Sequence, residues 1–214
     1  MNKKYILPIA FAIILASAVF VIAANWATET NFDFDEGWNL VYGLQSPEQL
    51  SGALEESNIK AIYAFIPTTQ QYLRAWPNPD AKAWEDLDKV MDDHELLQTA
   101  FWVYTDKGTA GTEGEYWLYD LPTPYTERPI YKGWNFVGIT PDMISNSAIE
   151  NIKGNCNIEK SYVWVNEFQE WREYALTNKF NENSFVGFGW VIKVSNNCNL
   201  GASVNIPQVP QMPN

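Results

Sequence analysis

Residues that hydrolytic and metal-dependent enzymes rely on are scarce in this sequence. Its 214 residues include one histidine and two cysteines. A zinc site built on several histidines is therefore excluded, and no Gly-x-Ser-x-Gly motif accompanies the single histidine. His94 lies among acidic residues near the end of an expected helix, where a cation is favourable. We interpret it as part of a solvated helix end, the alternative being a metal ligand or a base.

Positive charge is scarce as well. The 14 lysines and arginines are outnumbered by 26 acidic residues, which leaves a formal net charge of -12. A surface of this sign repels phosphate groups. The sequence therefore predicts that nucleic acid is not a partner.

Acidic side chains are then the remaining candidates for metal binding or catalysis. Residues 31–42 begin like a calcium loop, but Glu36 stands where that loop needs glycine and Tyr42 where it needs glutamate. We interpret this stretch as an alternating strand. Neighbouring carboxylates such as Glu55 and Glu56 are the residue type of a glycosidase, which also needs a deep cleft. Small domains leave little room for one, so we expect no enzyme, no metal and no cofactor.

A long hydrophobic run occurs at the start of the chain. Lys3 and Lys4 precede an apolar stretch over residues 5–24 that ends in two alanines. This layout is typical of a secretory signal peptide. The run is also nearly long enough to span a bilayer, so retention as a membrane anchor is the alternative. Either way we expect the protein to be extracellular or at the cell surface, with membrane contact only through this segment if it is uncleaved.

Tryptophan is abundant, with ten residues, and it recurs in ordered blocks. Residues 37–41, Gly-Trp-Asn-Leu-Val, return as Gly-Trp-Asn-Phe-Val at residues 133–137. Further blocks follow in the same order and align Tyr63 with Tyr162, Tyr72 with Trp171, and Trp102 with Trp190. Blocks shared in one order predict a single unit written twice.

The blocks are short, rich in β-branched and aromatic residues, and bounded by Gly, Pro and Asn, which predicts strands. Short helices are expected at residues 46–57 and after Thr140, and an amphipathic helix at residues 80–98 in the first copy. The fold class is therefore mainly β (α+β), with two tandem copies of a small β-sandwich or barrel-like domain. The expected boundaries are a signal peptide or anchor at 1–24, domains at 25–121 and 131–204, a Pro-rich linker at 122–130 and a Pro-rich tail at 205–214.

The blocks resemble a repeat of secreted and cell-surface proteins of prokaryotes, archaea among them. That repeat opens with Gly-Trp-Asn-Leu-Ile/Val, continues with an aromatic-Tyr strand and closes with a Gly-x-Gly-Tyr/Trp-Trp-like strand before a Cys. The second copy is the more similar, through residues 133–137, 162–164 and 187–191, Cys156 and Cys198. The first copy lacks cysteine and has Thr-Ala-Phe at residues 99–101 instead of the Gly-containing approach. The resemblance implies a surface module and no particular activity.

Both cysteines belong to the second copy. Ser57 and Ala110 stand at the aligned places of the first copy, so Cys156 and Cys198 are missing there together. Joint absence is expected of a bonded pair, and export supplies an oxidising environment. We predict a Cys156–Cys198 disulfide that ties two strand ends together, the alternative being two buried free thiols.

The tryptophans fall into two groups. Those that are aromatic in both copies are predicted to form the core, and they are Trp38, Trp102, Trp134, Trp164, Trp171 and Trp190. Aromatic residues without a counterpart are the candidates for a ligand-binding face, namely Trp76, Trp84, Trp117 and Tyr119. The alternative is that these cover the helix and sheet edge of the first copy.

The most consistent interpretation is a non-catalytic extracellular surface module for adhesion, envelope structure or protein–protein contact. Its expected partners are other surface proteins or envelope polysaccharide. The alternative is a carbohydrate-binding module that uses the aromatic residues of the first repeat.

Overall fold

The structure is a computed structural model. It describes residues 34–42, 58–78, 80–89, 91, 98–108, 125–140, 143–144, 148–180 and 188–201. The predicted signal or anchor segment, the helix expected at residues 46–57, His94 and the tail at 205–214 lie outside these residues. In the part of the chain that is described, no helix is long and apolar enough to cross a membrane.

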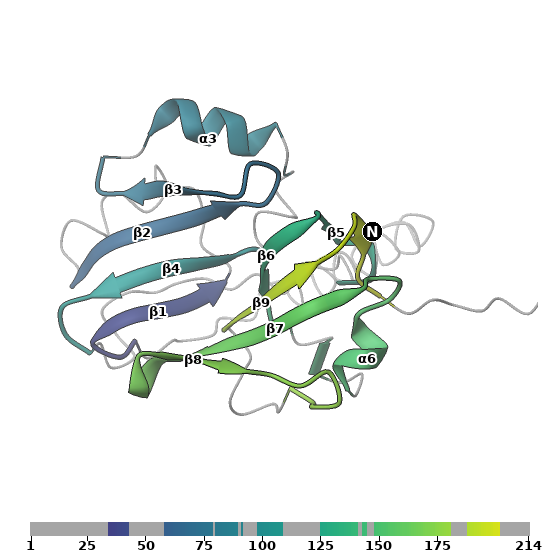
Figure 1. The fold of residues 1–214 in the computed structure, drawn as a ribbon. Coiled ribbons are helices and arrows are strands. Elements are labelled where there is room, and N and C mark those ends of the chain that lie inside the picture. The colour runs from purple at the N-terminus through teal and green to yellow at the C-terminus, as the bar shows by residue number, and fades with distance from the viewer. Residues whose placement is uncertain are drawn as a thin grey trace, which may run out of the picture.

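The first half of the chain forms a four-stranded antiparallel sheet (Figure 1). Its strands are β1 (Gly37–Tyr42), β2 (Ile59–Ile66), β3 (Gln71–Trp76) and β4 (Ala100–Thr105), in the spatial order β1-β4-β2-β3. Helix α3 (Ala81–Asp88) follows β3 and falls within the predicted amphipathic helix. Its Leu87 is fully buried against this sheet.

The second half forms another four-stranded antiparallel sheet, which lies beside the first (Figure 1). Its strands are β6 (Gly133–Gly138), β7 (Ile158–Val165), β8 (Glu170–Glu173) and β9 (Gly189–Val194), in the order β6-β9-β7-β8. The short elements are η2 (Tyr125–Glu127), β5 (Pro129–Ile130), α6 (Ile149–Ile152), η3 (Asn166–Phe168) and β10 (Cys198–Asn199). The chain is thus mainly β, as predicted.

The two four-stranded sheets share their strand order and their register. Gly37 begins β1 opposite Thr105 of β4, and Gly133 begins β6 opposite Val194 of β9. The pairing of β2 with β4 is interrupted one residue after Ile59, and that of β7 with β9 at the same place after Ile158. Trp38 and Trp134 therefore occupy the same position in β1 and β6, as the repeat predicts.

One predicted match is wrong by a single residue. Trp102 lies opposite Leu40, whereas the residue opposite Phe136, at the same position of the second sheet, is Val191. Trp190 therefore corresponds to Phe101 and not to Trp102. Because successive side chains of a strand point to opposite faces, this slip exchanges the two faces of the sheet.

The consequence is visible in burial. Trp190 is fully buried and donates from Nε1 to the Ser161 hydroxyl at 2.9 Å, while Trp102 is only half-buried on the opposite face of its sheet. The prediction that both are buried at matched positions is therefore wrong for Trp102. In the first half, the buried residue at the position of Trp190 is Phe101, which belongs to the first sheet's apolar cluster.

Three apolar clusters hold the fold. One packs against the outer face of the first sheet and includes Phe101 and Leu87, and a second packs against the second sheet around Trp190. The third joins the sheets and contains Leu40, Phe65, Ala100, Phe136 and Val191, with Trp102, Trp134 and Trp164 packed against it. Both halves contribute to this third cluster, so each sheet has apolar residues on both faces.

Backbone contacts also join the sheets. Val41 at the end of β1 bridges to Phe188, and Val137 of β6 bridges to Thr99 in the same way. The buried Arg128 reinforces the second bridge, because its guanidinium donates to the carbonyl of Gln98, to the Thr99 hydroxyl and to the carbonyl of Phe136. The described part of the expected Pro-rich linker is therefore packed between the halves.

The predicted disulfide is present. Cys156 and Cys198 are bonded, with their Cα atoms 5.2 Å apart and a sequence separation of 42. Cys156 precedes β7 and Cys198 begins β10, which pairs with β5. The bond therefore ties the residues just before β7 to the start of β10.

Replacing both cysteines by serine should lower the free energy of unfolding by about 2–4 kcal/mol, because a loop of this length gains conformational freedom in the unfolded chain. Urea denaturation followed by tryptophan fluorescence measures this change. An unfolding free energy equal to that of the unchanged protein would show that the bond does not stabilise the fold.

Candidate functional site

The site is built on a glutamine from each half that reaches across to the edge strand of the other half. Gln169 accepts a hydrogen bond from the backbone N–H of Trp38 at 2.7 Å and donates from Nε2 to the carbonyl of Trp38 at 2.9 Å. A primary amide carries one acceptor and one donor group, like a peptide unit. The side chain therefore pairs with the open edge of β1 as another strand would.

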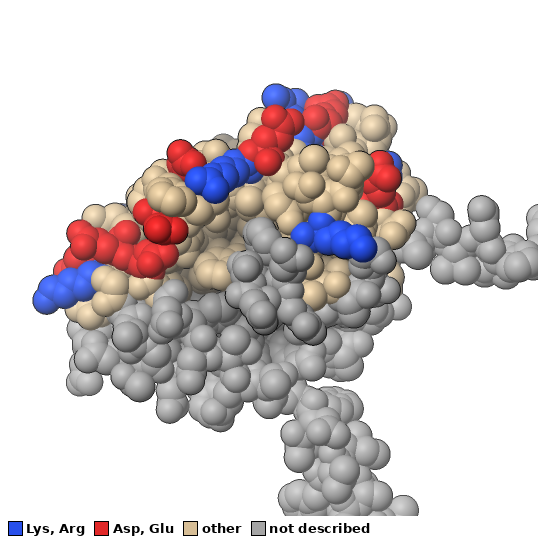
Figure 2. All heavy atoms as spheres, turned by 90° about the horizontal axis from the view of Figure 1, so that it is seen from below, with Lys and Arg blue, Asp and Glu red and all other residues tan. Residues whose placement is uncertain are grey.

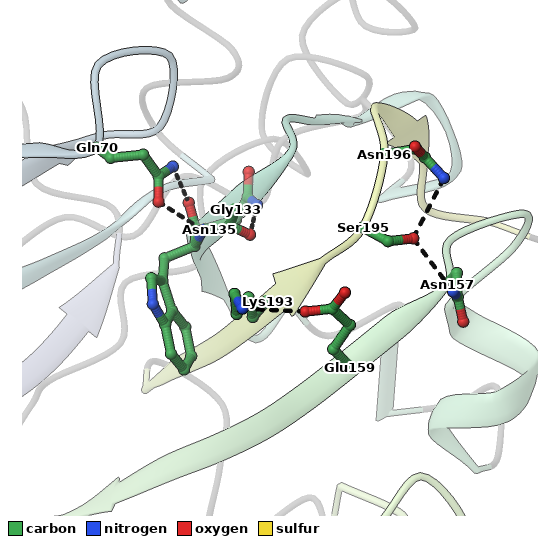
Figure 3. A network of polar contacts seen from close by, with 9 residues as sticks. Gln70, Gly133, Asn135, Asn157, Glu159, Lys193, Ser195 and Asn196 are labelled. Carbon is green, nitrogen blue, oxygen red and sulfur yellow. Dashed lines mark hydrogen bonds and ion pairs between the residues drawn. The ribbon is translucent and has the colours of Figure 1, made fainter.

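The second half of the chain receives the same contact from the first. Gln70, in the turn between β2 and β3, accepts from the N–H of Trp134 at 2.7 Å and donates to its carbonyl at 3.0 Å (Figure 3). Both glutamines are non-glycine residues with positive φ, 56° for Gln70 and 50° for Gln169. Such a backbone costs free energy, and it persists where the surroundings require it. Two equivalent turns are thus held in the same strained conformation by reciprocal docking.

Glycine is required at the two positions that the glutamine side chains contact, Gly37 and Gly133. Gly37 and Gly133 have φ values of 102° and 100°, which side chains rarely adopt. A Cβ on Gly133 would come within 2.6 Å of Gln70 Oε1, and one on Gly37 within 2.5 Å of Gln169 Oε1. The glycine of the Gly-Trp-Asn motif therefore makes room for the opposite half.

The asparagine side chain of each motif fixes the backbone just before its strand by hydrogen bonds. Asn39 accepts from the N–H of Asp35 at 3.0 Å and donates back to the carbonyl of Asp35 at 2.9 Å. Asn135 makes the same pair of bonds with Tyr131, at 2.9 and 2.7 Å. Both asparagines are buried. Together the three residues of the motif present the Trp backbone to the opposite glutamine.

A groove lined by aromatic side chains lies at the junction that these contacts define. Its first pocket has a volume of about 360 Å³ and is lined by Trp38, Tyr63, Tyr72, Trp102, Trp164 and Trp171. Four of these come from the first half of the chain and two from the second. Because the lining belongs to both sheets, neither half alone could form this pocket.

A second pocket adjoins the first. It measures about 640 Å³ and is lined by Phe65, Gln70, Tyr72, Trp134, Phe136, Lys160, Tyr162, Trp171 and Val191. By the shared register, each residue of the first pocket has its counterpart here, for example Tyr162 for Tyr63 and Val191 for Trp102. Tyr72 and Trp171 line both pockets. The two pockets thus form one groove with these two rings between them.

The rings of the groove are packed edge to face. The centroids of Trp102 and Trp164 lie 5.0 Å apart at 86°, and those of Trp164 and Trp171 lie 5.3 Å apart at 76°. This arrangement is the one that aromatic pairs prefer. Trp164 is held further by a hydrogen bond from Nε1 to the carbonyl of Trp38 at 2.8 Å. The lining is therefore organised before any ligand arrives.

Two rings of the groove are strongly exposed. Tyr72 is 56% accessible to solvent, and Trp171 is 42% accessible although it belongs to the tryptophans that were predicted to form the core. Trp38, Trp102, Trp134 and Trp164 are half-buried beside them. Of that predicted core set only Trp190 is fully buried, so the repeated aromatic residues mostly line the groove.

Of the sequence-predicted ligand-binding residues, the structure describes the side chain of Trp76 alone. Trp76 is half-buried and packs against the first apolar cluster. Trp84 belongs to α3, but its side chain is outside the described part of the structure, as are Trp117 and Tyr119. Trp76 lines neither pocket of the groove.

Among the residues that line the two pockets, Lys160 is the only charged one. Seen from below, acidic and basic side chains lie interspersed among uncharged ones (Figure 2). Hydrogen bonds from Lys82 and Lys89 lower the pKa of Asp86 to about 2, but this exposed group lies on α3. Within the described ranges, no cluster of His, Cys, Asp or Glu could hold a metal ion. The groove can therefore bind by ring contacts and by the few polar groups of its lining, which include Gln70 and Lys160.

No family model, curated protein or solved structure significantly matches this chain.

Replacing Gly133 by alanine should destabilise the protein by about 2 kcal/mol or more, since the positive φ and the contact with Gln70 both oppose a Cβ. In a Gln70→Ala background the same change should cost less, because only the backbone strain remains. The two costs are compared by urea denaturation of the four proteins of the double-mutant cycle.

Gly108→Ala is the matched control, because its Cβ would come no closer than 3.4 Å to the carbonyl of Phe34, an ordinary contact. If Gly133→Ala lowers the free energy of unfolding equally with and without Gln70, the Gln70 side chain does not pack closely against Gly133.

Proposed function

We propose that this chain is a non-catalytic binding module that acts outside the cell and contacts its partner through the aromatic groove. The observation that carries the proposal is the groove itself, in which six aromatic rings from two sheets line one open pocket. Exposed apolar surface that is contiguous and preorganised marks sites of interaction in soluble proteins. Aromatic rings also dominate the energetics of such sites.

The exposed rings support binding more than they support folding. A Trp left 42% accessible and a Tyr left 56% accessible forfeit much of the stabilisation that burial would give them. Neighbouring rings such as Phe65 and Phe136, which are 6% exposed, show that the junction is otherwise well packed. A partner that covers Tyr72 and Trp171 would recover that stabilisation.

The matching registers of the two sheets support an origin of the groove in two tandem copies of one unit. The Cys156–Cys198 disulfide is compatible with an oxidising compartment and so with the predicted export. Adhesion and envelope structure both require a module that presents a binding surface of this kind. Other surface proteins are therefore the favoured partners.

Envelope polysaccharide is the second candidate. Exposed Trp and Tyr rings are suited to stacking on the flat faces of sugars. The second pocket adds polar side chains, Gln70 and Lys160, beside its rings. This candidate places the sugar in the groove and not on the unmatched aromatic residues of the first half.

Replacing Tyr72 and Trp171 together by alanine should weaken binding of the full chain to an envelope preparation of the producing cells at least about tenfold, because the two most exposed anchor rings are lost. Phe168→Ala is the matched control, since Phe168 is 54% exposed and packs beneath Arg172, outside both pockets. Binding is measured by co-sedimentation at increasing protein concentration.

Treating the envelope preparation with protease or with periodate separates the candidates. Loss of binding after protease supports a protein partner, and loss after periodate supports a polysaccharide. If the double variant binds as well as Phe168→Ala, the groove is not the binding surface.

A further inference from the structure

We propose that a third pocket, outside the groove, binds a primary ammonium group carried on an alkyl chain. A lysine side chain and a small polyamine both present this group. The pocket has a volume of about 420 Å³ and lies where η3 meets the start of β1 (Figure 1). We call it the junction pocket, and its lining includes Asp35, Trp164, Asn166, Glu173 and Phe188.

Negative charge dominates the lining of the junction pocket. It contains one guanidinium, that of Arg172, and three carboxylates, those of Asp35, Glu167 and Glu173. Arg172 donates from Nε to Glu170 at 3.0 Å, and its guanidinium lies over the Phe168 ring, 4.9 Å from the centroid. Neither of these partners lines the pocket, so the one cation of the lining is engaged outside it. The charges therefore favour a cation as the ligand.

A buried acceptor without a partner belongs to the same lining. Asn166 is 8% exposed and donates from Nδ2 to Oδ1 of Asn39 at 2.9 Å. Within the described residues, Oδ1 of Asn166 receives no hydrogen bond. Buried acceptors are nearly always satisfied, and an exception indicates a water, an ion or a ligand. Because Nδ2 is already bonded to Asn39, the oxygen is the group of this amide that a ligand could use.

The asparagine of the first Gly-Trp-Asn motif brings a carboxylate to this acceptor. Oδ1 of Asn39 accepts from the N–H of Asp35 at 3.0 Å as well as from Nδ2 of Asn166. One atom thus holds a residue that precedes β1 beside a residue of η3. The carboxylate of Asp35 is exposed and forms no ion pair with any described residue. A ligand at this end of the pocket meets an anionic and a neutral acceptor together.

The arrangement of acceptors fits an ammonium group and not a metal ion. No three acidic, cysteine or histidine residues of the described ranges are placed to hold a metal, so the carboxylates of the pocket do not converge on one point. An alkylammonium group has three N–H donors and no acceptor, and it can bond to separate acceptors. The pocket supplies such acceptors in Asp35 and Asn166.

The apolar part of the lining suits an alkyl chain. Val163, Val165 and Phe188 belong to it, and the Trp164 ring adds an aromatic surface. Alkyl stems of cationic side chains pack along such surface while the charged head stays among polar groups. A cation close to an aromatic face is attracted to it as well. Trp164 also lines the first pocket of the groove, so the two sites share one ring.

The other half of the chain provides an internal comparison. By the shared register and the shared backbone contacts, three acceptors of the pocket correspond to residues without a carboxylate or a side-chain amide, namely Tyr131 for Asp35, Pro67 for Asn166 and Arg74 for Glu173. The repeated fold therefore does not need acceptors at these positions. Their occurrence together at one junction indicates that they serve binding.

The test uses ¹⁵N NMR on the full chain, with pentylamine as the probe. The side-chain amide of Asn166 reports on the junction pocket, and the indole N–H of the buried Trp190 reports on folding. Pentanol has the same alkyl chain without the charge, and tetramethylammonium has the charge without N–H donors. The titration is repeated on Asp35→Asn and on Glu36→Gln, which removes a neighbouring exposed charge that does not line the pocket.

Pentylamine should shift the Asn166 amide in a saturable manner and leave Trp190 in place. Pentanol and tetramethylammonium should bind at least about tenfold more weakly, because each lacks part of what the acceptors recognise. Asp35→Asn should weaken pentylamine binding by a similar factor, and Glu36→Gln should not. Tyr72→Ala should leave it unchanged, since Tyr72 lines both pockets of the groove but not this one.

Two further ligands distinguish the sources of the ammonium group. One is an acetylated and amidated alanine peptide with a single central lysine, and the other is diaminopentane. Tighter binding of the peptide assigns the pocket to a lysine side chain of a protein. Tighter binding of the diamine assigns it to a small polyamine.

An Asn166 amide that does not respond to pentylamine would overturn the inference. Equal binding of tetramethylammonium or pentanol would also overturn it, because charge or apolar contact alone would then suffice. Equal effects of Asp35→Asn and Glu36→Gln would reduce the site to diffuse attraction by an acidic surface. If Tyr72→Ala abolishes the response, the amine binds in the groove instead. None of these results depends on envelope binding, so this inference and the proposed function fail separately.

Discussion

A side-chain amide that takes the place of a missing strand is the interaction on which this structure depends. The strands β1 and β6 are edges of their sheets, and an edge strand leaves backbone N–H and C=O groups without a neighbour. Gln169 and Gln70 supply both groups of one residue, Trp38 in one sheet and Trp134 in the other. Because each half docks on the other in the same way, these two contacts fix the sheets relative to each other. They also satisfy backbone groups on both edge strands.

The groove follows from that docking. When the sheets meet through Phe65 and Phe136, whose centroids are 4.8 Å apart, the rings around this contact are left between the sheets with one side open. The two pockets differ because Trp102 and Trp164 of the first correspond to the smaller Val191 and Phe65 of the second. The first pocket is thus the more aromatic and the second the larger and more polar. A ligand that spans both meets two different environments on either side of Tyr72 and Trp171.

Much of the fold could be predicted from local sequence patterns, and the site could not. Alternating aromatic and β-branched residues located the strands, and the joint absence of two cysteines from the first half identified the disulfide. The match of Trp102 with Trp190 failed because strand side chains alternate, so an alignment error of one residue changes the face that a residue occupies. The placement of one sheet against the other depends on contacts between residues far apart in sequence. Gln70 and Gln169 left one signal, since each stands two residues before an aligned aromatic residue, Tyr72 and Trp171.

Hydrogen exchange at two backbone amides tests the central claim most directly. The N–H groups of Trp38 and Trp134 belong to edge strands and are bonded to a glutamine side chain of the other half. Exchange measured by NMR on the native protein should show both amides protected, and each should lose its protection when the glutamine that binds it is replaced by alanine. If both amides exchange as fast as those of an unstructured peptide in the intact protein, the two sheets are not held by this contact and the groove between them is not preorganised.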